Sequence, residues 1–197
     1  MIIFFGVNTI KQELKMSERF AVIDTETNWE NDVMSIGIVI AEDEQFQAID
    51  QRYYIIDEAA RVGGMYSYAM QLNGQKPELL KKKKAIEAIK DFLNANGIKK
   101  LFAYNASFDA KCLPELHEYC WHDILKLAAY KQHNQAIPAS APCCGTGRLK
   151  SGYKVEDILC MFGEKGYTEL HNALTDAIDE LRIMNYLNHP IKKYPKL

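Results

Sequence analysis

Long hydrophobic runs are missing from this 197-residue sequence, and none approaches the roughly 20 residues that a membrane-spanning helix needs. The apolar start, residues 1–7, is too short for the core of a signal peptide and has no basic residue before it and no small-residue cleavage site. The five cysteines are odd in number, which fits a compartment where thiols stay reduced. We therefore expect a cytoplasmic protein that does not bind a membrane.

An excess of positive charge is also missing, because 26 acidic residues and 24 Lys and Arg give a formal net charge of −2. This charge argues against a protein that holds DNA by bulk positive charge. It does not exclude a nuclease, because acidic residues that hold metal ions must be counted together with those ions. Apolar residues at 48% and charged residues at 25% are typical of a globular protein.

One domain is expected, since domains of roughly 100–200 residues are ordinary. We assign it residues 16–190, with 191–197 as a short C-terminal tail. Residues 1–15 look unlike the rest, and codons for Gln12 and Glu13 can contain the ribosome-binding sequence of bacterial messages, just upstream of Met16. The segment 1–15 is therefore either a non-native extension, with translation starting at Met16, or an extra N-terminal strand or arm.

The order of the expected elements predicts an α/β fold. Strands are expected at 20–24, 35–40, 45–56 and 101–104, and a strand-to-helix piece at 121–131. An apolar stripe predicts a helix that begins near Pro77 and stops before Gly97; its members are Leu79, Ile86, Ile89 and Leu93. Further helices are expected at 107–117, 154–162 and 172–187, whereas 57–76 and 132–153 are expected to be irregular. This order is typical of helices packed around one mixed sheet.

The first chemically suggestive segment is Asp24-Thr25-Glu26, at the end of the first expected strand. Residues two apart on a strand point the same way, so both carboxylates can face one point in space. Buried side by side, they would repel strongly unless a cation neutralised them. Taken alone the pair is weak evidence, because most such acids are solvated surface charges.

Two later segments have the same ambiguity when taken singly. Asp109 opens an expected helix, where Asn105 or Ser107 would be an ordinary N-cap and an acid favours the positive end of the helix dipole. His171 and Asp176 are five residues apart and do not share a helical face. They can still meet if His171 lies in the loop before the helix; otherwise they are a surface His and an N-terminal helix acid.

Together, the three segments resemble the three exonuclease motifs of the DEDDh family of 3′-to-5′ exonucleases, which includes polymerase proofreading subunits and oligoribonucleases. The matching segments are Asp-Thr-Glu-Thr at 24–27, Asn-x-x-Phe-Asp at 105–109 and His-x-Ala-x-x-Asp-Ala at 171–177. The resemblance covers about residues 18–188. It implies a ribonuclease H-like α/β fold: a mixed five-stranded sheet whose first three strands are antiparallel, flanked by helices.

The sequence departs from the family pattern at positions that are not metal ligands. Asn28 and Trp29 stand where the family often has a second Thr and a Gly, and Tyr104 stands where a His commonly precedes the second motif. The stretch 59–76 lacks the family's usual small motif. These departures leave the choice between DNA and RNA open.

The resemblance implies a 3′–5′ exonuclease that hydrolyses phosphodiester bonds at the 3′ ends of single-stranded DNA or RNA and releases nucleoside monophosphates. The cofactors would be two divalent ions, Mg²⁺ or Mn²⁺. Asp24 would bridge both ions, Glu26 and Asp176 would complete the ion that carries the attacking water, and Asp109 would hold the other. His171 would accept the proton from that water, because imidazole has a pKa near the operating pH.

Substrate contacts are expected from residues near these motifs: Thr27, Trp29, Asn105, Phe108, Arg148 and Lys150. Trp29 and Phe108 are suited to stacking on terminal bases, although Trp29 is also explained as an exposed loop aromatic and Phe108 as a core residue. Arg148 and Lys150 lie in a basic, glycine-rich loop that can follow a phosphate backbone or simply be solvated.

Two competing interpretations remain at this point. Clustered Cys and His residues tempt a zinc assignment, but their spacing is not that of structural zinc sites, and Cys112 and Cys160 are better explained as core residues. A catalytically weak exonuclease-fold module that binds a polymerase or an RNA-processing complex is the alternative function. The sequence does not reveal whether a polymerase or a second copy of the chain is a partner.

Overall fold

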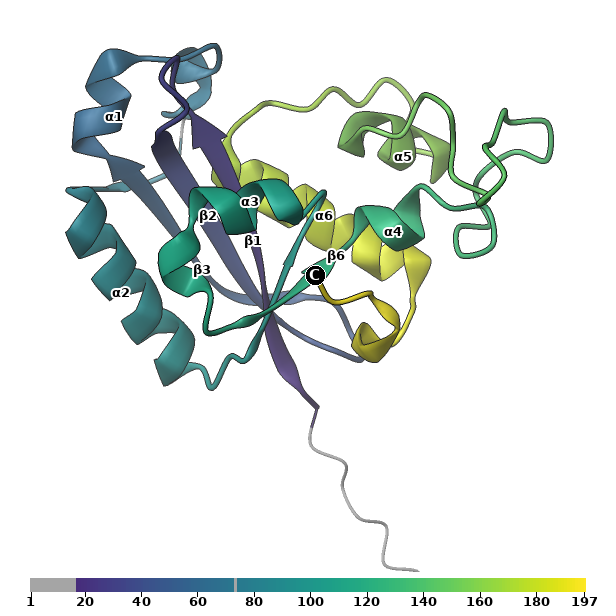
Figure 1. The fold of residues 1–197 in the computed structure, drawn as a ribbon, viewed down its shortest axis with the longest axis horizontal. Helices are drawn as coiled ribbons and strands as arrows, with labels where there is room; N and C mark the ends of the chain where they lie inside the picture. Colours follow the sequence, from purple (N-terminus) through teal and green to yellow (C-terminus); the bar gives the residue numbers. More distant parts are fainter. Residues whose placement is uncertain (1–16, 73) are drawn as a thin grey trace, which may run out of the picture.

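The computed structural model describes residues 17–72 and 74–197, so the segment 1–15 lies outside the described residues. Within that range, one mixed sheet has six strands in the order β4-β3-β2-β1-β5-β6 (Figure 1). The strands are β1 (Arg19–Thr27), β2 (Val33–Glu42), β3 (Ala48–Ile56), β4 (Glu78–Leu80), β5 (Lys100–Ala103) and β6 (Cys120–Asp123). β1, β2 and β3 are antiparallel neighbours, as expected, and the other three strands run parallel to their neighbours.

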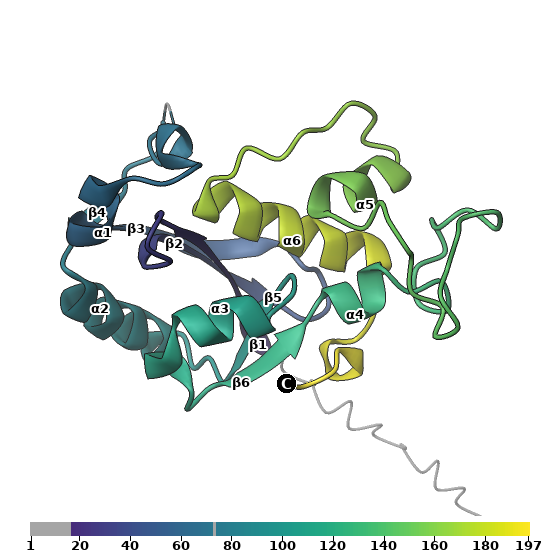
Figure 2. The same cartoon turned by 45° about the horizontal axis from the view of Figure 1, so that its top comes forward.

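Helices cover both faces of this sheet (Figure 2). The helices are α1 (Asp57–Val62), α2 (Lys82–Ala95), α3 (Ser107–Cys112), α4 (Leu125–Ala128), α5 (Val155–Met161) and α6 (Ala173–Leu187). α4, α5 and α6 pack on one face, and α1, α2 and α3 lie on the other. No helix within the described residues is both long enough and apolar enough to cross a membrane.

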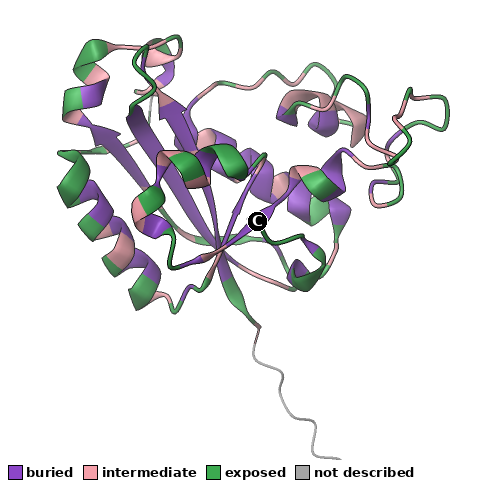
Figure 3. Ribbon diagram, in the orientation of Figure 1, coloured by how far each residue is buried: buried purple, intermediate pink, exposed green. Residues whose placement is uncertain are grey.

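β1 is buried because it runs through the middle of the sheet (Figure 3). Its side chains alternate between the two cores: Phe20 and Val22 face α6, whereas Ala21 and Ile23 face α2. The same alternation, continued to the end of the strand, directs Asp24 and Glu26 to the α6 face and Thr25 to the other. The carboxylates thus lie at the end of a rigid strand.

The first turn of α6 lies directly on the sheet. Gly37 of β2 pairs with Asp24 of β1, and a Cβ atom at Gly37 would lie 2.1 Å from the carbonyl oxygen of Ala173. Ala173 and Ala177 are fully buried on the facing side of α6. Small residues on both surfaces therefore allow the helix to approach the strand that carries Asp24.

The predicted sheet was one strand short, and the predicted start of α2 was wrong. Residues Glu78–Leu80 form β4, parallel to β3, and α2 begins only at Lys82. Leu79 is 62% exposed, so it does not belong to the buried stripe of α2. The stretch expected to be irregular, 57–76, also contains α1 and a 3₁₀ helix at Ser67–Ala69.

The expected helix 107–117 is interrupted. α3 ends at Cys112, and a separate 3₁₀ helix occupies Pro114–Leu116, because Pro114 cannot continue the hydrogen-bonding of α3. Cys112 and Cys160 are half-buried, rather than the core residues that the sequence suggested. The C-terminal tail packs against β6, where the Leu197 N–H donates to the Trp121 carbonyl and Tyr194 is buried.

Candidate active site

Three predicted site residues come together at the end of β1. Ligand atoms of Glu26, His171 and Asp176 all lie within 4.8 Å of one another. Asp176 is in the first turn of α6, and His171 lies just before the helix in a left-handed backbone conformation with φ 55°. The expected arrangement of a loop His meeting a helix Asp is therefore what the structure has. Among the described residues, this is the one group of three or more His, Cys, Asp or Glu whose ligand atoms are that close.

Asp109 approaches the site from α3. It is buried, and its Oδ1 accepts a hydrogen bond of 2.8 Å from the Thr25 hydroxyl on the other face of β1. It is close enough to Asp24 for its charge to raise the pKa of Asp24. α3 has Ala106 as its N-cap and no side-chain capping bond, so the capping roles considered for Asn105 and Ser107 are wrong.

The four acids have pKa values displaced upward. Burial, followed by the charges of Asp109 and Glu180, holds the pKa of Asp24 well above its usual range. Burial and the charge of Glu169 raise the pKa of Glu26 and of Asp176 to about 8. Burial raises the pKa of Asp109 to about 7, against the hydrogen bond from Thr25. Each raised pKa means that the ionised form of these four acids is unfavourable without positive charge nearby.

The carboxylates fit divalent cations. Oδ2 of Asp24 and Oδ1 of Asp176 are buried and have no hydrogen-bond partner within residues 17–72 and 74–197. Buried polar atoms normally have a hydrogen-bond partner, so two buried carboxylate oxygens without one are suited to bind a cation. Mg²⁺ and Mn²⁺ take oxygen ligands of this kind. Asp24, Glu26, Asp109 and Asp176 are therefore the residues suited to hold such ions.

The surroundings of His171 favour its neutral form. Its ring stacks on Tyr66, with ring centroids 3.8 Å apart and an interplanar angle of 19°. Burial lowers the pKa of His171, and the charge of Glu156 opposes this shift. A neutral imidazole has a free nitrogen that accepts a proton, which is the property of a general base.

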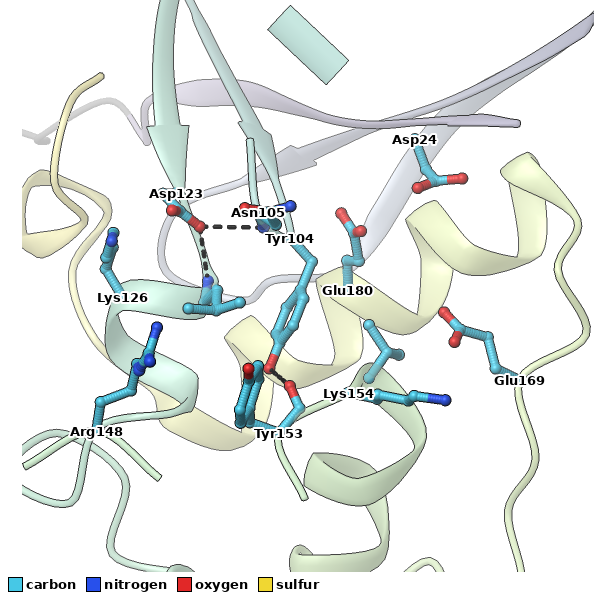
Figure 4. A pocket seen from close by; sticks show the side chains of 12 residues that line it. Asp24, Tyr104, Asn105, Asp123, Lys126, Arg148, Tyr153, Lys154, Glu169 and Glu180 are labelled. Carbon is cyan, nitrogen blue, oxygen red and sulfur yellow. Dashed lines mark hydrogen bonds between the residues drawn. The ribbon is translucent and has the colours of Figure 1, made fainter. Parts of the chain in front are cut away.

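Two pockets flank the carboxylates. Pocket A, of about 460 Å³, is lined by Thr27, Trp29 and Phe108, together with Met65, Tyr66 and the Glu26–His171–Asp176 group. Pocket B, of about 430 Å³, is lined by Asn105, Arg148 and Tyr153, with Lys126 and Lys154 (Figure 4). Asp24 and Glu169 line both pockets, so the acids lie between them.

No family model and no curated protein matches this sequence, but solved structures resemble the fold. The nuclease domain of 3′hExo, a DEDDh family member bound to rAMP, is 12% identical with a TM-score of 0.60; the match covers 87% of this chain and 92% of that one. The fold is that of the DEDDh 3′-exonucleases. It is a ribonuclease H-like fold, as the motifs implied.

Two other structures with this exonuclease fold extend the comparison. A 3′-exonuclease that recognises the 3′ end of a histone mRNA stem-loop is 10% identical, with 92% and 71% of the two chains covered and a TM-score of 0.62. Exonuclease I of E. coli, bound to an oligonucleotide, is 13% identical with a TM-score of 0.60. The match covers 86% of this chain and 40% of that protein. At such low sequence identity, the structural likeness establishes the fold and not the activity.

Most predicted substrate residues line a pocket of the exonuclease fold, but one does not. Thr27, Trp29 and Phe108 line pocket A, and Trp29 and Phe108 are 64% and 46% exposed, so Phe108 is not a core residue. Lys150 lines neither pocket; it is exposed, and its backbone N–H donates to Pro142.

Several residues beside these acids were not found by sequence reasoning. They are Tyr66 and Met65 in pocket A, Lys126, Asp123 and Glu180 in pocket B, and Glu169 between the pockets. Glu180 had a readable signal, because it lies four residues after Asp176 and so on the same face of a helix. The others had none, because only the tertiary fold brings them to the site.

Proposed function

We propose that this protein is a metal-dependent 3′–5′ exonuclease that hydrolyses single-stranded nucleic acid and releases nucleoside monophosphates. The observation that carries the proposal is the meeting of Glu26, His171 and Asp176 within 4.8 Å, beside an Asp24 whose Oδ2 has no partner in the described part of the chain. Acids at one point can hold the ions of metal-assisted phosphodiester hydrolysis, and a neutral imidazole beside them can accept a proton.

The four acids are proposed to hold two divalent ions. Asp24 lines pocket A with the Glu26–His171–Asp176 group and is close enough to Asp109 to feel its charge, so it is the residue suited to contact both ions. When bound, two such ions supply charge stabilisation to the attacking and leaving oxygens of an in-line displacement. Thr25 keeps Asp109 in place through its hydrogen bond, and Gly37 keeps Asp176 close to β1.

His171 is proposed to accept the proton of the attacking water. The stacking on Tyr66 fixes the imidazole ring, and its lowered pKa leaves a nitrogen free near neutral pH. The position of His171 before α6, rather than in it, separates proton transfer from ion binding by Asp176. Each group then does one task without displacing the other.

The two pockets suggest how a strand lies across the site. Pocket A combines Trp29, Tyr66 and Phe108, which are suited to stacking on the terminal base. Pocket B has Lys126 and Arg148 at the end away from Asp24, suited to phosphates further along the strand (Figure 4). On this proposal the terminal nucleoside binds in pocket A and the remaining strand in pocket B.

A single digestion experiment tests this function. DNA and RNA single strands labelled at the 5′ end are incubated with the protein and Mg²⁺ or Mn²⁺. We expect a ladder shortening from the 3′ end, nucleoside monophosphate as the product, and complete loss of activity with EDTA. Asp24→Asn is the matched inactive variant.

The alternatives give different results. Hydrolysis that survives EDTA excludes the proposed use of metal ions, and internal cleavage excludes an exonuclease. Binding of the strands without any hydrolysis, at the same level in Asp24→Asn, supports the binding-module alternative instead.

A further inference from the structure

A fifth acid, Glu180, belongs to the same cluster. It lies on α6, four residues after Asp176 and on the same helix face, and it is only 2% exposed. Glu180 lines pocket B together with Asp24 (Figure 4). Oε2 of Glu180 is buried and has no hydrogen-bond partner among the residues that the structure describes. A buried carboxylate with a free oxygen therefore points into the site.

The groups around Glu180 make this position unfavourable for an isolated acid. Those that raise its pKa, after burial itself, are Asp109, Asp176 and Glu169, and Glu180 in turn raises the pKa of Asp24. The backbone of Tyr104 opposes the shift. Lys154 lines the same pocket, yet Glu180 forms no ion pair in the described ranges. The charges that act most strongly on Glu180 are thus those of other acids, although three cationic side chains line the same pocket.

The preceding residue shows how this fold supports a structural acid. Asp179 is 1% exposed, but it accepts a hydrogen bond from the Tyr167 hydroxyl and pairs with Arg182 at 3.3 Å. Glu180 has no comparable partner for Oε2. An apolar side chain would fill a purely structural position at lower cost. The ionised form of Glu180 is therefore favourable only with a cation that is not part of the chain.

We propose that Glu180 is an additional ligand for a divalent cation, on the pocket B side of Asp24. This inference rests on the proposed function, in which Asp24 and Asp109 hold one of the two ions. Glu180 approaches from the second turn of α6, so the ion there is held from β1, α3 and α6 together. A third carboxylate gives this ion as many anionic ligands as the ion held by Asp24, Glu26 and Asp176, and each added anionic ligand strengthens binding.

The test measures Mn²⁺ binding directly, in the absence of nucleic acid, by the electron paramagnetic resonance signal of the free ion. Loss of even an outer-shell partner typically weakens a metal site by about 10–100-fold, so we expect Glu180→Gln to weaken one site at least tenfold. Asp179→Asn is the matched control: it removes an adjacent buried acid that has its own partners, so Mn²⁺ affinity should not change.

The unfolding temperature separates ion binding from folding. Glu180→Gln and the apolar variant Glu180→Met should be at least as stable as the natural protein in EDTA, because both remove repulsion between acids. The same variants should gain less stability from Mn²⁺. If they unfold in EDTA well below the natural protein, Glu180 has a structural role and the proposal is overturned.

Other outcomes distinguish this proposal from the proposed function. Unchanged Mn²⁺ affinity in Glu180→Gln overturns the ligand assignment even if the natural protein is an active exonuclease. A natural protein that binds two Mn²⁺ ions, one of them weakened by Glu180→Gln, but digests no strand overturns the function and supports the ligand. A natural protein that binds no Mn²⁺ overturns both.

Discussion

At the scale of single residues, His171 offers the sharpest test of the mechanism. His171→Ala should lower the rate by about 10²–10⁴-fold, because that is the typical contribution of a general base. The acidic limb of the pH–rate profile should disappear, and the remaining rate should rise with pH as hydroxide replaces the imidazole. Mn²⁺ affinity should stay unchanged, because Asp176 and Glu26 remain. A variant with full activity, or with strongly weakened Mn²⁺ binding, contradicts the role.

Trp29 tests the assignment of pocket A. It lines pocket A and is 64% exposed, so removing its ring should leave the fold intact. Stacking on a base is worth about 1–3 kcal/mol, so Trp29→Ala should raise KM about 5- to 150-fold and change kcat less. Trp121→Phe is the control, because Trp121 is buried and lines neither pocket, so its KM should stay unchanged. An unchanged KM excludes Trp29 from the substrate.

The residues of the motifs were predictable because the three segments together resemble the exonuclease motifs, although each segment alone was ambiguous. Asp24 and Glu26 share a face through strand alternation, and His171 precedes the helix that contains Asp176. Lys126 and Tyr66 were not predictable, because they reach the pockets only through the way β6 and the segment after α1 fold back on the sheet. Lys150 was predicted to contact the substrate because of its positive charge, and charge alone does not specify toward which surface a side chain points.

At the scale of elements, the contact between β2 and α6 decides whether the acids meet. Gly37→Ala places a Cβ 2.1 Å from the Ala173 carbonyl, so the first turn of α6 must move. Overpacking typically costs about 1–3 kcal/mol and occasionally more, and we expect activity to fall further because Asp176 moves with the helix. Thermal unfolding and Mn²⁺ binding check this. Gly145→Ala is the control, since a Cβ there meets nothing within 4 Å; equal effects of the two substitutions contradict the argument.

Asn172 fixes the start of α6 and therefore the position of His171. Its Oδ1 caps the Thr175 N–H, and its Nδ2 donates to the Ala69 carbonyl and the Tyr53 hydroxyl. Asn172→Ala removes a cap worth about 1 kcal/mol and leaves buried groups unpaired at about 1–3 kcal/mol. We expect a correspondingly lower free energy of unfolding in urea. Asn172→Ser keeps the capping oxygen and should lose less; a Ser variant as unstable as the Ala variant would refute the capping role.

The elements themselves were largely predictable, and the exceptions have physical reasons. β1, β2 and α6 have buried patterns long enough to specify their type. β4 has three residues, and its Leu79 is exposed, so the parallel pairing with β3 leaves no hydrophobic pattern to read. Leu79 was therefore assigned to the apolar stripe of the predicted helix. Short edge strands are specified by their neighbours rather than by their own sequence.

At the scale of the whole molecule, the acid cluster predicts how stability depends on pH and metal. Without a cation, the pKa of Glu26 and of Asp176 is about 8 and that of Asp109 about 7, all above the values near 4 of an unfolded chain. The folded protein then binds more protons than the unfolded chain between about pH 4 and 8. The free energy of unfolding in EDTA should therefore fall as pH rises through this window.

Divalent ions should reverse that trend, because they bind the ionised acids of the folded protein. At one hundred times its Kd, an ion adds about 2.7 kcal/mol, and each kcal/mol corresponds to about 2–4 °C in Tm for a chain of this size. The Tm increase caused by Mn²⁺ should be larger at pH 8 than at pH 5.5, since protons and metal compete for the same oxygens. Scanning calorimetry in EDTA and in Mn²⁺ across this range measures both trends.

The double variant Asp24→Asn/Asp176→Asn should show a flatter pH dependence of Tm and almost no increase in Tm with Mn²⁺. A Tm in EDTA that rises from pH 5.5 to 8 would mean that other groups of the chain already neutralise the acid cluster. The cluster would then need no bound cation.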